Sequence, residues 1–134
     1  MRGASAIEEA LAAARGVAVR VFVVWEPVLA GDTRPPSPGV LARLADPRAT
    51  HVWDPERLVS RSLLGGEPVD DVSGRVDVVG GQRVLWDWVA VYPPGVTWHG
   101  RTPRAAFQGG IVIDVAAELR RHIAAAPQAS APAR

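Results

Sequence analysis

The chain has 134 residues, enough for one domain with a buried core, and 48% of them are hydrophobic, an ordinary fraction for a globular protein. Its net charge is +1, with acidic and basic residues interspersed, so the sequence offers no basic surface for nucleic acid or for an anionic membrane. Because cysteine is absent, thiol nucleophiles, disulfides, iron–sulfur clusters and cysteine-bound zinc are excluded for this chain.

The sequence gives no targeting signal. No apolar run approaches the roughly 20 residues that a membrane-spanning helix needs. The N-terminus leads into Glu8 and Glu9 rather than into an apolar segment, so it does not resemble a secretory signal. A cytoplasmic protein without a cofactor is therefore expected.

The first predicted helix covers residues 5–15. Ser5 and Glu8 have the spacing of a capping box, and Gly16 is placed to end the helix. An apolar stripe that can lie on a sheet is formed by Ile7, Leu11 and Ala14. Only four residues precede Ser5, so the strand that normally precedes such a helix is expected to be missing from the N-terminus.

The strongest predicted strand covers residues 17–25, in which Arg20 is the single charge. Both of its faces are apolar, which is typical of a central strand covered on both sides. Such a strand predicts an α/β domain in which a central mixed sheet carries helices on both faces.

The middle of the chain predicts a second strand–helix passage. A loop at 28–36 leads to a short helix that begins at Ser37-Pro38 and ends at Asp46-Pro47. A strand at 50–53 then precedes a helix that begins at Asp54-Pro55 and extends to Leu64. Residues 67–81 are open between a loop and a hairpin that turns at Gly80-Gly81.

The last third predicts strands and a closing helix. The expected elements are a strand at 84–92, a turn at 93–95, short strands at 96–98, 105–107 and 111–113, a turn at 109–110 and a helix at 114–125. Residues 127–134 are expected to be a disordered tail, which leaves a single domain at 1–126.

This order resembles the C-terminal three-quarters of the thioredoxin fold, over residues 5 to about 125. The closing part, with Thr102-Pro103, an apolar strand, Gly109-Gly110, the strand 111–113 and a helix, is similar to the thioredoxin tail, in which the proline is cis. Further segments are similar to a group of bacterial thioredoxin-like proteins: 23–29, His51-Val52-Trp53-Asp54, Trp86-Asp87 and Tyr92-Pro93-Pro94-Gly95. In an alternative register, residues 84–98 form the last hairpin of the family and Pro103 lies in a connection.

The resemblance fails at the redox motif. Thioredoxins carry C-x-x-C at the start of the first helix, where the helix dipole lowers the thiol pKa. This chain has Arg2-Gly3-Ala4-Ser5 at that place. Two interpretations remain: a redox-inactive relative, or a longer thiol-disulfide oxidoreductase whose cysteines lie upstream of Met1.

The candidate pocket or groove combines polar residues at strand ends with aromatic residues. Glu26 and Asp32 follow the first strand at the sheet edge where ligands collect in open α/β sheets. The full candidate set is Trp25, Glu26, Asp32, His51, Trp53, Asp54, Trp86, Asp87 and Pro103. The simpler interpretation is that Asp54 caps a helix, Trp53 packs, and His51 is an ordinary edge residue. Because the three histidines have no ligand spacing, no metal site is predicted.

The sequence therefore predicts a non-catalytic domain that binds an unknown protein or small molecule. Two enzyme hypotheses remain beside it: the dithiol oxidoreductase, and a hydrolase that depends on Asp32, Asp54 or Glu26. The missing strand also predicts an uncovered sheet edge, through which the protein would self-associate or pair with a partner strand.

Overall fold

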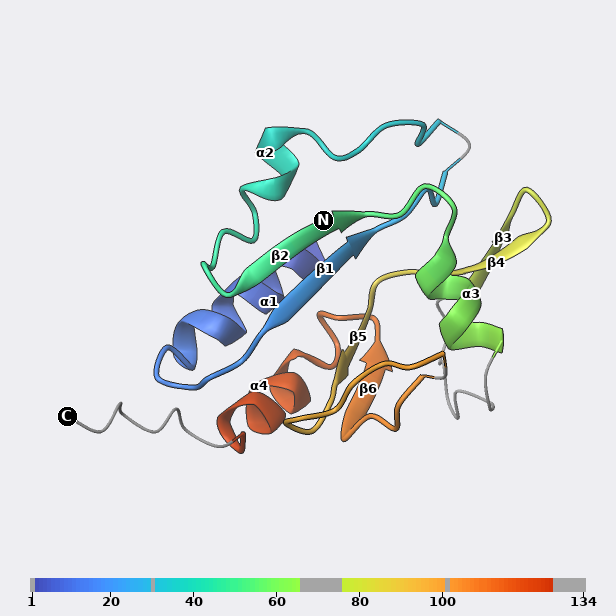
Figure 1. The fold of residues 1–134 in the computed structure, drawn as a ribbon. Coiled ribbons are helices and arrows are strands. Elements are labelled where there is room, and N and C mark those ends of the chain that lie inside the picture. The colour runs from blue at the N-terminus through green and yellow to red at the C-terminus, as the bar shows by residue number, and fades with distance from the viewer. Residues whose placement is uncertain (1, 30, 66–75, 101, 127–134) are drawn as a thin grey trace.

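The computed structural model describes residues 2–29, 31–65, 76–100 and 102–126, and it shows a mixed α/β chain (Figure 1). In chain order its elements are α1 (Arg2–Ala13), β1 (Val21–Trp25), α2 (Pro38–Leu41), β2 (Ala49–Trp53), α3 (Leu58–Gly65), β3 (Val76–Val79), β4 (Gln82–Leu85), β5 (Trp88–Val91), β6 (Phe107–Gly110) and α4 (Ala116–Ala124). The predicted α/β class is thus confirmed. No helix in these ranges has the length and apolar character that crossing a membrane requires.

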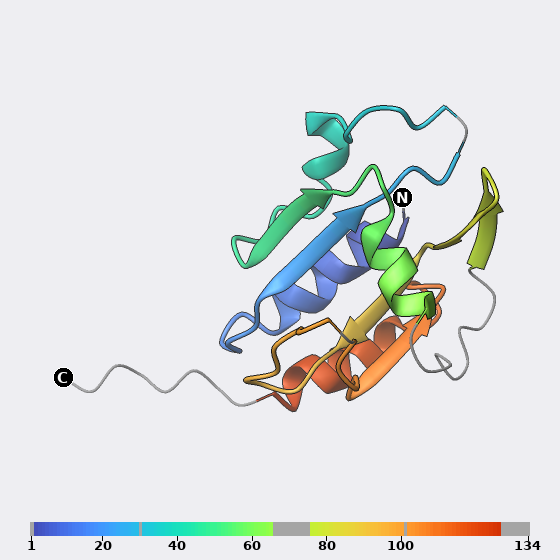
Figure 2. The ribbon, with the colours of Figure 1, turned by 45° about the vertical axis from the view of Figure 1, so that its right-hand side comes forward.

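The strands form three separate pairs, where the sequence predicted one central mixed sheet. β1 pairs with β2 in parallel, β3 with β4 antiparallel, and β5 with β6 antiparallel. Figures 1 and 2 show β2, β1, β5 and β6 following one another across the molecule. β1 and β5 are not hydrogen-bonded to each other, however, so the continuous sheet is not shown.

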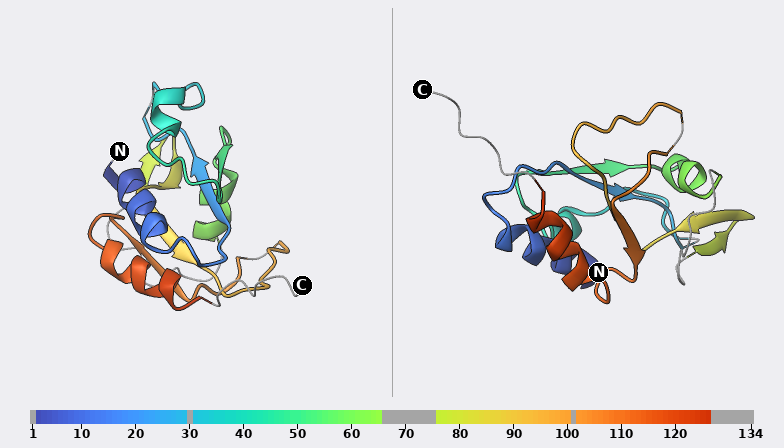
Figure 3. Two further views of the ribbon diagram at one scale, coloured as in Figure 1. Left: turned by 90° about the vertical axis from the view of Figure 1, so that its left-hand side faces the viewer. Right: turned by 90° about the horizontal axis from the view of Figure 1, so that it is seen from below.

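The core lies between the strands and one helical layer. Its buried centre consists of Ala10, Leu11, Leu44, Leu119 and Ile123. Alternate residues of two strands, Val21 and Val23 in β1 and Val89 and Val91 in β5, pack on this centre. Figure 3 shows α1 and α4 together on the same side of these strands.

The prediction that helices cover both faces of the first strand is wrong. The strand begins at Val21 rather than at Val17, and α1 covers only the face that carries Val21 and Val23. Phe22, on the opposite face, keeps 61% of its surface exposed. An apolar pattern on both faces shows that a strand can be buried on both sides. It does not show that a second helix is present to cover the second side.

Several element ends differ from the predictions for local reasons. α1 begins at Arg2, and Glu8 bonds to another segment instead of completing a capping box with Ser5. The hairpin at Gly80-Gly81 is confirmed, because both glycines have the positive φ angles, 60° and 77°, that a tight hairpin turn requires. The predicted tail 127–134 lies outside the described residues, as does 67–75.

The end of the chain matches neither predicted register completely. The predicted strand 84–92 is divided at Asp87, whose φ of +51° interrupts an extended strand. β5 pairs with β6 and not with residues 96–98, so the hairpin of the alternative register is not formed, although Pro103 does lie in a connection as that register expected. Gly109-Gly110 belongs to β6 rather than to a turn, and 111–113 is not a strand.

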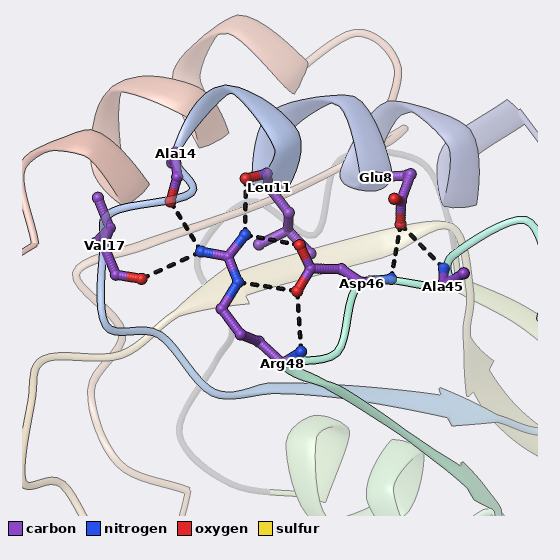
Figure 4. Close-up of polar contacts among 7 residues, drawn as sticks. All are labelled: Glu8, Leu11, Ala14, Val17, Ala45, Asp46 and Arg48. Atoms are coloured by element: carbon purple, nitrogen blue, oxygen red, sulfur yellow. Dashed lines mark hydrogen bonds and ion pairs between the residues drawn. The ribbon is translucent and has the colours of Figure 1, made fainter.

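Arg48 joins α1 to the segment that leads into β2 (Figure 4). Its Nε and Nη2 donate to the two carboxylate oxygens of Asp46, at 2.8 and 2.7 Å. The remaining N–H groups donate to the carbonyls of Leu11, Ala14 and Val17 at 2.7, 2.8 and 3.1 Å, around the C-terminal end of α1. A cation at this end is favoured by the helix dipole, and the guanidinium satisfies carbonyls that the helix leaves free.

Glu8 makes a second connection between the same two segments. Its Oε2 accepts hydrogen bonds from the backbone N–H groups of Ala45 and Asp46, both at 3.0 Å. α1 is thus held to the α2–β2 connection by an acidic side chain near its middle and by an arginine at its end (Figure 4).

Acid should weaken this connection. The hydrogen bonds from Arg48 lower the pKa of Asp46 from its usual value of 3.8 to about 2. Because the folded pKa is below the unfolded one, the stability that this group contributes is complete above pH 4 and is lost as the pH falls towards 2. Asp46→Asn should lower the free energy of unfolding by about 1–3 kcal/mol at pH 7.

Urea unfolding at pH 7, 4 and 2.5, followed by circular dichroism, measures this effect. The difference between wild type and Asp46→Asn should shrink at the lowest pH, while Asp114→Asn, an exposed control, should show no such change. A constant difference across the three pH values would contradict the assignment.

Candidate functional site

The carboxyl ends of β1 and β2 bring Glu26 and Asp54 together. The register pairs Trp25 with Trp53, so the residues that follow them lie side by side at the same end of the strand pair. Asp54 N also donates to the carbonyl of Trp25 at 2.8 Å. The sequence predicted both carboxylates as site residues, and parallel pairing is what makes them neighbours.

Glu26 is bound by Ser60 in α3. Ser60 N donates to Glu26 Oε1 at 2.9 Å, and Ser60 Oγ donates to Oε2. The same hydroxyl accepts the backbone N–H of Leu85 at 2.9 Å, and only 1% of Ser60 is exposed. The Glu26–Ser60 pair therefore links β1, α3 and β4, which is a structural role, and solvent has almost no access to the hydroxyl.

Asp54 serves the start of the same helix. It is 7% exposed, and its Oδ2 accepts the N–H of Val59 at 2.9 Å. Both carboxylates thus lie at the N-terminus of α3, where free N–H groups and the helix dipole favour negative charge. The simpler interpretation of Asp54 as a helix cap is confirmed, although α3 itself begins only at Leu58.

Burial dominates the electrostatics of Glu26. Desolvation raises its pKa above the usual 4.5, and the charge of Asp54 acts in the same direction. The hydrogen bonds from Ser60 oppose the shift but do not cancel it. A carboxyl group that holds its proton more tightly than usual is suited to acid–base chemistry, but here its oxygens are already engaged by Ser60.

His51 is occupied by structural contacts at both ring nitrogens. Trp25 Nε1 donates to His51 Nδ1 at 2.9 Å, and His51 Nε2 lies 2.9 Å from the carbonyl of Leu44. Since Nδ1 accepts, Nε2 must carry the proton that it donates to Leu44. The two rings also stack, with centroids 5.9 Å apart. This arrangement joins β1, β2 and the segment that follows α2, and it leaves neither nitrogen free to ligate a metal.

The remaining predicted residues lie elsewhere. Asp32 Oδ2 accepts the N–H groups of Val28 and Leu29 at 3.1 and 2.8 Å, which closes its own loop. Trp86 Nε1 donates to Asp77 at 3.0 Å beside the β3–β4 hairpin. Asp87 lies against the start of α1, because a Cβ added at Gly3 would stand 2.6 Å from its Oδ1. These residues do not join the Glu26–Asp54 pair in one pocket.

Pro103 lies in the connection between β5 and β6. The peptide bond before Pro103 is not cis, unlike that of the proline in the thioredoxin tail that this segment resembles. Among the described residues the cis peptide bond joins Gly110 to Ile111.

An exposed apolar surface on β1 and β2 is not among the residues predicted from the sequence. Phe22 and Val52 are 61% and 40% exposed, and the register places them on one face, because Val24, two residues from Phe22, pairs with Val52. Val52 also lines an open groove with Leu58, which is 52% exposed. We call Phe22, Val52 and Leu58 the apolar face. The sequence indicates this surface through the second apolar side of the strand at 17–25.

Neither metal chemistry nor relatives identify the site. Within the described ranges, no three acidic or histidine side chains gather so that they could hold a metal ion. Comparison with family models, curated proteins and solved structures found no match to this chain.

Glu26→Gln should stabilise the protein at neutral pH and change little in acid. With its folded pKa raised, Glu26 favours folding while protonated, and that contribution is lost as the pH rises from about 4.5 through the folded pKa. Glutamine keeps an oxygen acceptor for Ser60 N without a buried charge. Urea unfolding at pH 4 and pH 7 should show the gain only at pH 7. Glu56→Gln, on an exposed side chain, is the matched control, and an equal gain in both variants would contradict the account.

Proposed function

We propose that this chain is a redox-inactive, thioredoxin-like domain that acts as a protein-interaction module, binding through the apolar face of Phe22, Val52 and Leu58. The observation that carries the proposal is the exposure of this face on a strand whose other side is part of the core. Val52 and Leu58 line one groove, Phe22 lies on the same strand face as Val52, and exposed apolar surface of this kind on a folded protein marks a site of interaction.

The polar groups support a binding role better than a catalytic one. Glu26, Asp54 and His51 are the residues on which hydrolysis or acid–base chemistry would depend. Each of them bonds to backbone or side-chain groups that hold β1, β2 and α3 in place. A catalytic carboxylate would need at least one oxygen directed at a substrate, and Glu26 uses both of its oxygens on Ser60.

A protein segment fits this surface better than a small ligand. Small-molecule sites are concave and enclose most of the ligand. The groove beside Val52 is open, and Phe22 projects from a strand face. An extended or helical segment could cover such a surface by contacting all three side chains.

The thioredoxin-like part of the proposal has its own support. A helix, a strand, further helices with a short strand, antiparallel strands and a closing helix follow one another in the order that the resemblance implies. The alternative of an oxidoreductase with cysteines upstream of Met1 stays a prediction, since the chain itself contains no cysteine.

A displayed library of random 12-residue peptides, selected against the wild-type protein, tests the proposal. The enriched peptides should be apolar, and their affinity should fall at least about tenfold on Phe22→Ser or Val52→Ser, because each change removes a large apolar contact. Titration calorimetry with purified peptides measures the loss.

Val78→Ser is the matched control. Val78 lies on the β3–β4 hairpin and is 69% exposed, so the substitution removes a similar side chain from another surface. Peptide binding should be unchanged in this variant. Failure to enrich any peptide, or an equal loss in Val78→Ser, would overturn the proposed function.

A further inference from the structure

The outer edge of β1 has backbone groups that find no partner in the part of the chain that the structure describes. In the parallel pair with β2, Val21 N donates to Arg48 O at 3.0 Å and Asp54 N donates to Trp25 O at 2.8 Å, so Val21, Val23 and Trp25 direct their backbone groups towards β2. Successive residues of a strand alternate in this direction. Phe22 and Val24 therefore direct their N–H and C=O groups to the other edge, and no described residue pairs with them.

The nearest strand on that side does not fill this edge. β5 follows β1 across the molecule, and its Val89 and Val91 pack on the same core as Val21 and Val23 (Figures 1 and 2). β5 nevertheless pairs only with β6 among the described strands. Two strand edges in one layer, above one pair of helices, thus have no hydrogen-bond partner within the described ranges.

Trp88 gives an independent indication at the start of β5. Its indole Nε1 is buried and has no hydrogen-bond partner among the described residues. Buried indole N–H groups normally find an acceptor, and lacking one is costly. The side chain lies on the face opposite Val89, which is the face that Phe22 occupies on β1. An oxygen atom that a bound segment brings to this face would supply the missing acceptor.

From these observations we infer that β1 accepts one extended strand from another protein, which pairs with Phe22 and Val24 on the side that faces β5. This inference goes beyond the proposed function, because it names a second binding surface that shares Phe22 with the apolar face but lies on the side of β1 away from Val52. Its mode is the addition of a β-strand. The neighbouring side chains define the partner. One face of the added strand meets Val21, Val23, Val89 and Val91, and the other meets Phe22 and Trp88, so the segment is uncharged and apolar on both faces.

The position of β5 favours a free segment over a second copy of this chain. For two folded copies to join their β1 edges, each would have to bring its own β5 and β6 into the same space (Figure 2). A single extended segment of four or five residues carries no such neighbours. Adding it would complete hydrogen bonds along β1.

The test uses a soluble strand peptide with the sequence Lys-Thr-Val-Val-Ile-Val-Thr-Lys and a control peptide that is N-methylated at alternate residues. N-methylation removes the N–H groups that pair with one neighbouring strand while keeping the side chains. The unmodified peptide should bind the full chain, as followed by tryptophan fluorescence and titration calorimetry, and the methylated peptide should bind at least about tenfold more weakly.

Proline substitution in β1 tests the edge itself. Proline is tolerated where a strand N–H points away from its neighbour, and it disrupts a strand where the N–H is bonded. Val24→Pro should therefore fold and lose peptide binding at least about tenfold, whereas Val23→Pro, which removes a bond to β2, should fail to fold. Unchanged peptide affinity in folded Val24→Pro would overturn strand addition.

Each other outcome is decisive as well. If library peptides bind through Phe22 but are indifferent to Val24→Pro and to N-methylation, the interaction function stands and strand addition is overturned. If the wild type alone dimerises in sedimentation equilibrium and Val24→Pro is monomeric, the occupant is a second copy and the free-segment inference is overturned. If Val24→Pro fails to fold, equal binding of the two peptides by the wild type overturns the inference.

Discussion

The fold depends on the guanidinium of Arg48. All five of its N–H groups are engaged, two by Asp46 and three by carbonyls at the end of α1. α1 and the α2–β2 connection are far apart in sequence, and this contact holds the segment that leads into β2 against the end of α1. A planar fork of donors suits this task, because carbonyls at several positions can be satisfied at once. Lysine, with one compact charge, could not reproduce the arrangement.

From this anchor the polar interactions continue along the strand pair. Trp25 and His51 join β1 and β2 near their carboxyl ends, and the Glu26–Ser60 pair then joins β1 to α3 and β4. The polar residues that could take part in a reaction are therefore the ones that hold the elements together. What remains for recognition is apolar surface and backbone, which is why we assign the function to Phe22, Val52, Leu58 and the edge of β1 rather than to a reactive group.

Local patterns in the sequence predicted most elements, but not how they assemble. The hairpin at Gly80-Gly81, the strand that ends at Trp53 and the cap formed by Asp54 follow from turn, strand and helix-capping chemistry, which act within a few residues. The covering of β1 does not follow from such rules. An apolar residue such as Phe22 gives the same sequence pattern whether a helix or solvent covers it. The roles of Glu8 and Arg48 depend on partners more than thirty residues away. The proximity of Glu26 to Asp54 could be predicted from the sequence, because parallel strands end at the same edge. The contact of Glu26 with Ser60 could not.

The exposed strand β1 also creates a risk of aggregation that the flanking sequence has to limit. Val21–Trp25 is five consecutive apolar residues with high strand propensity, the kind of segment that stacks into fibrils when it is unprotected. Arg20 precedes it and Pro27 follows closely, and a charge and a proline at these positions act as gatekeepers against stacking. An edge that is open enough to receive a strand is thus kept from propagating along copies of itself. The flanking residues that limit fibril growth also leave the backbone between them available.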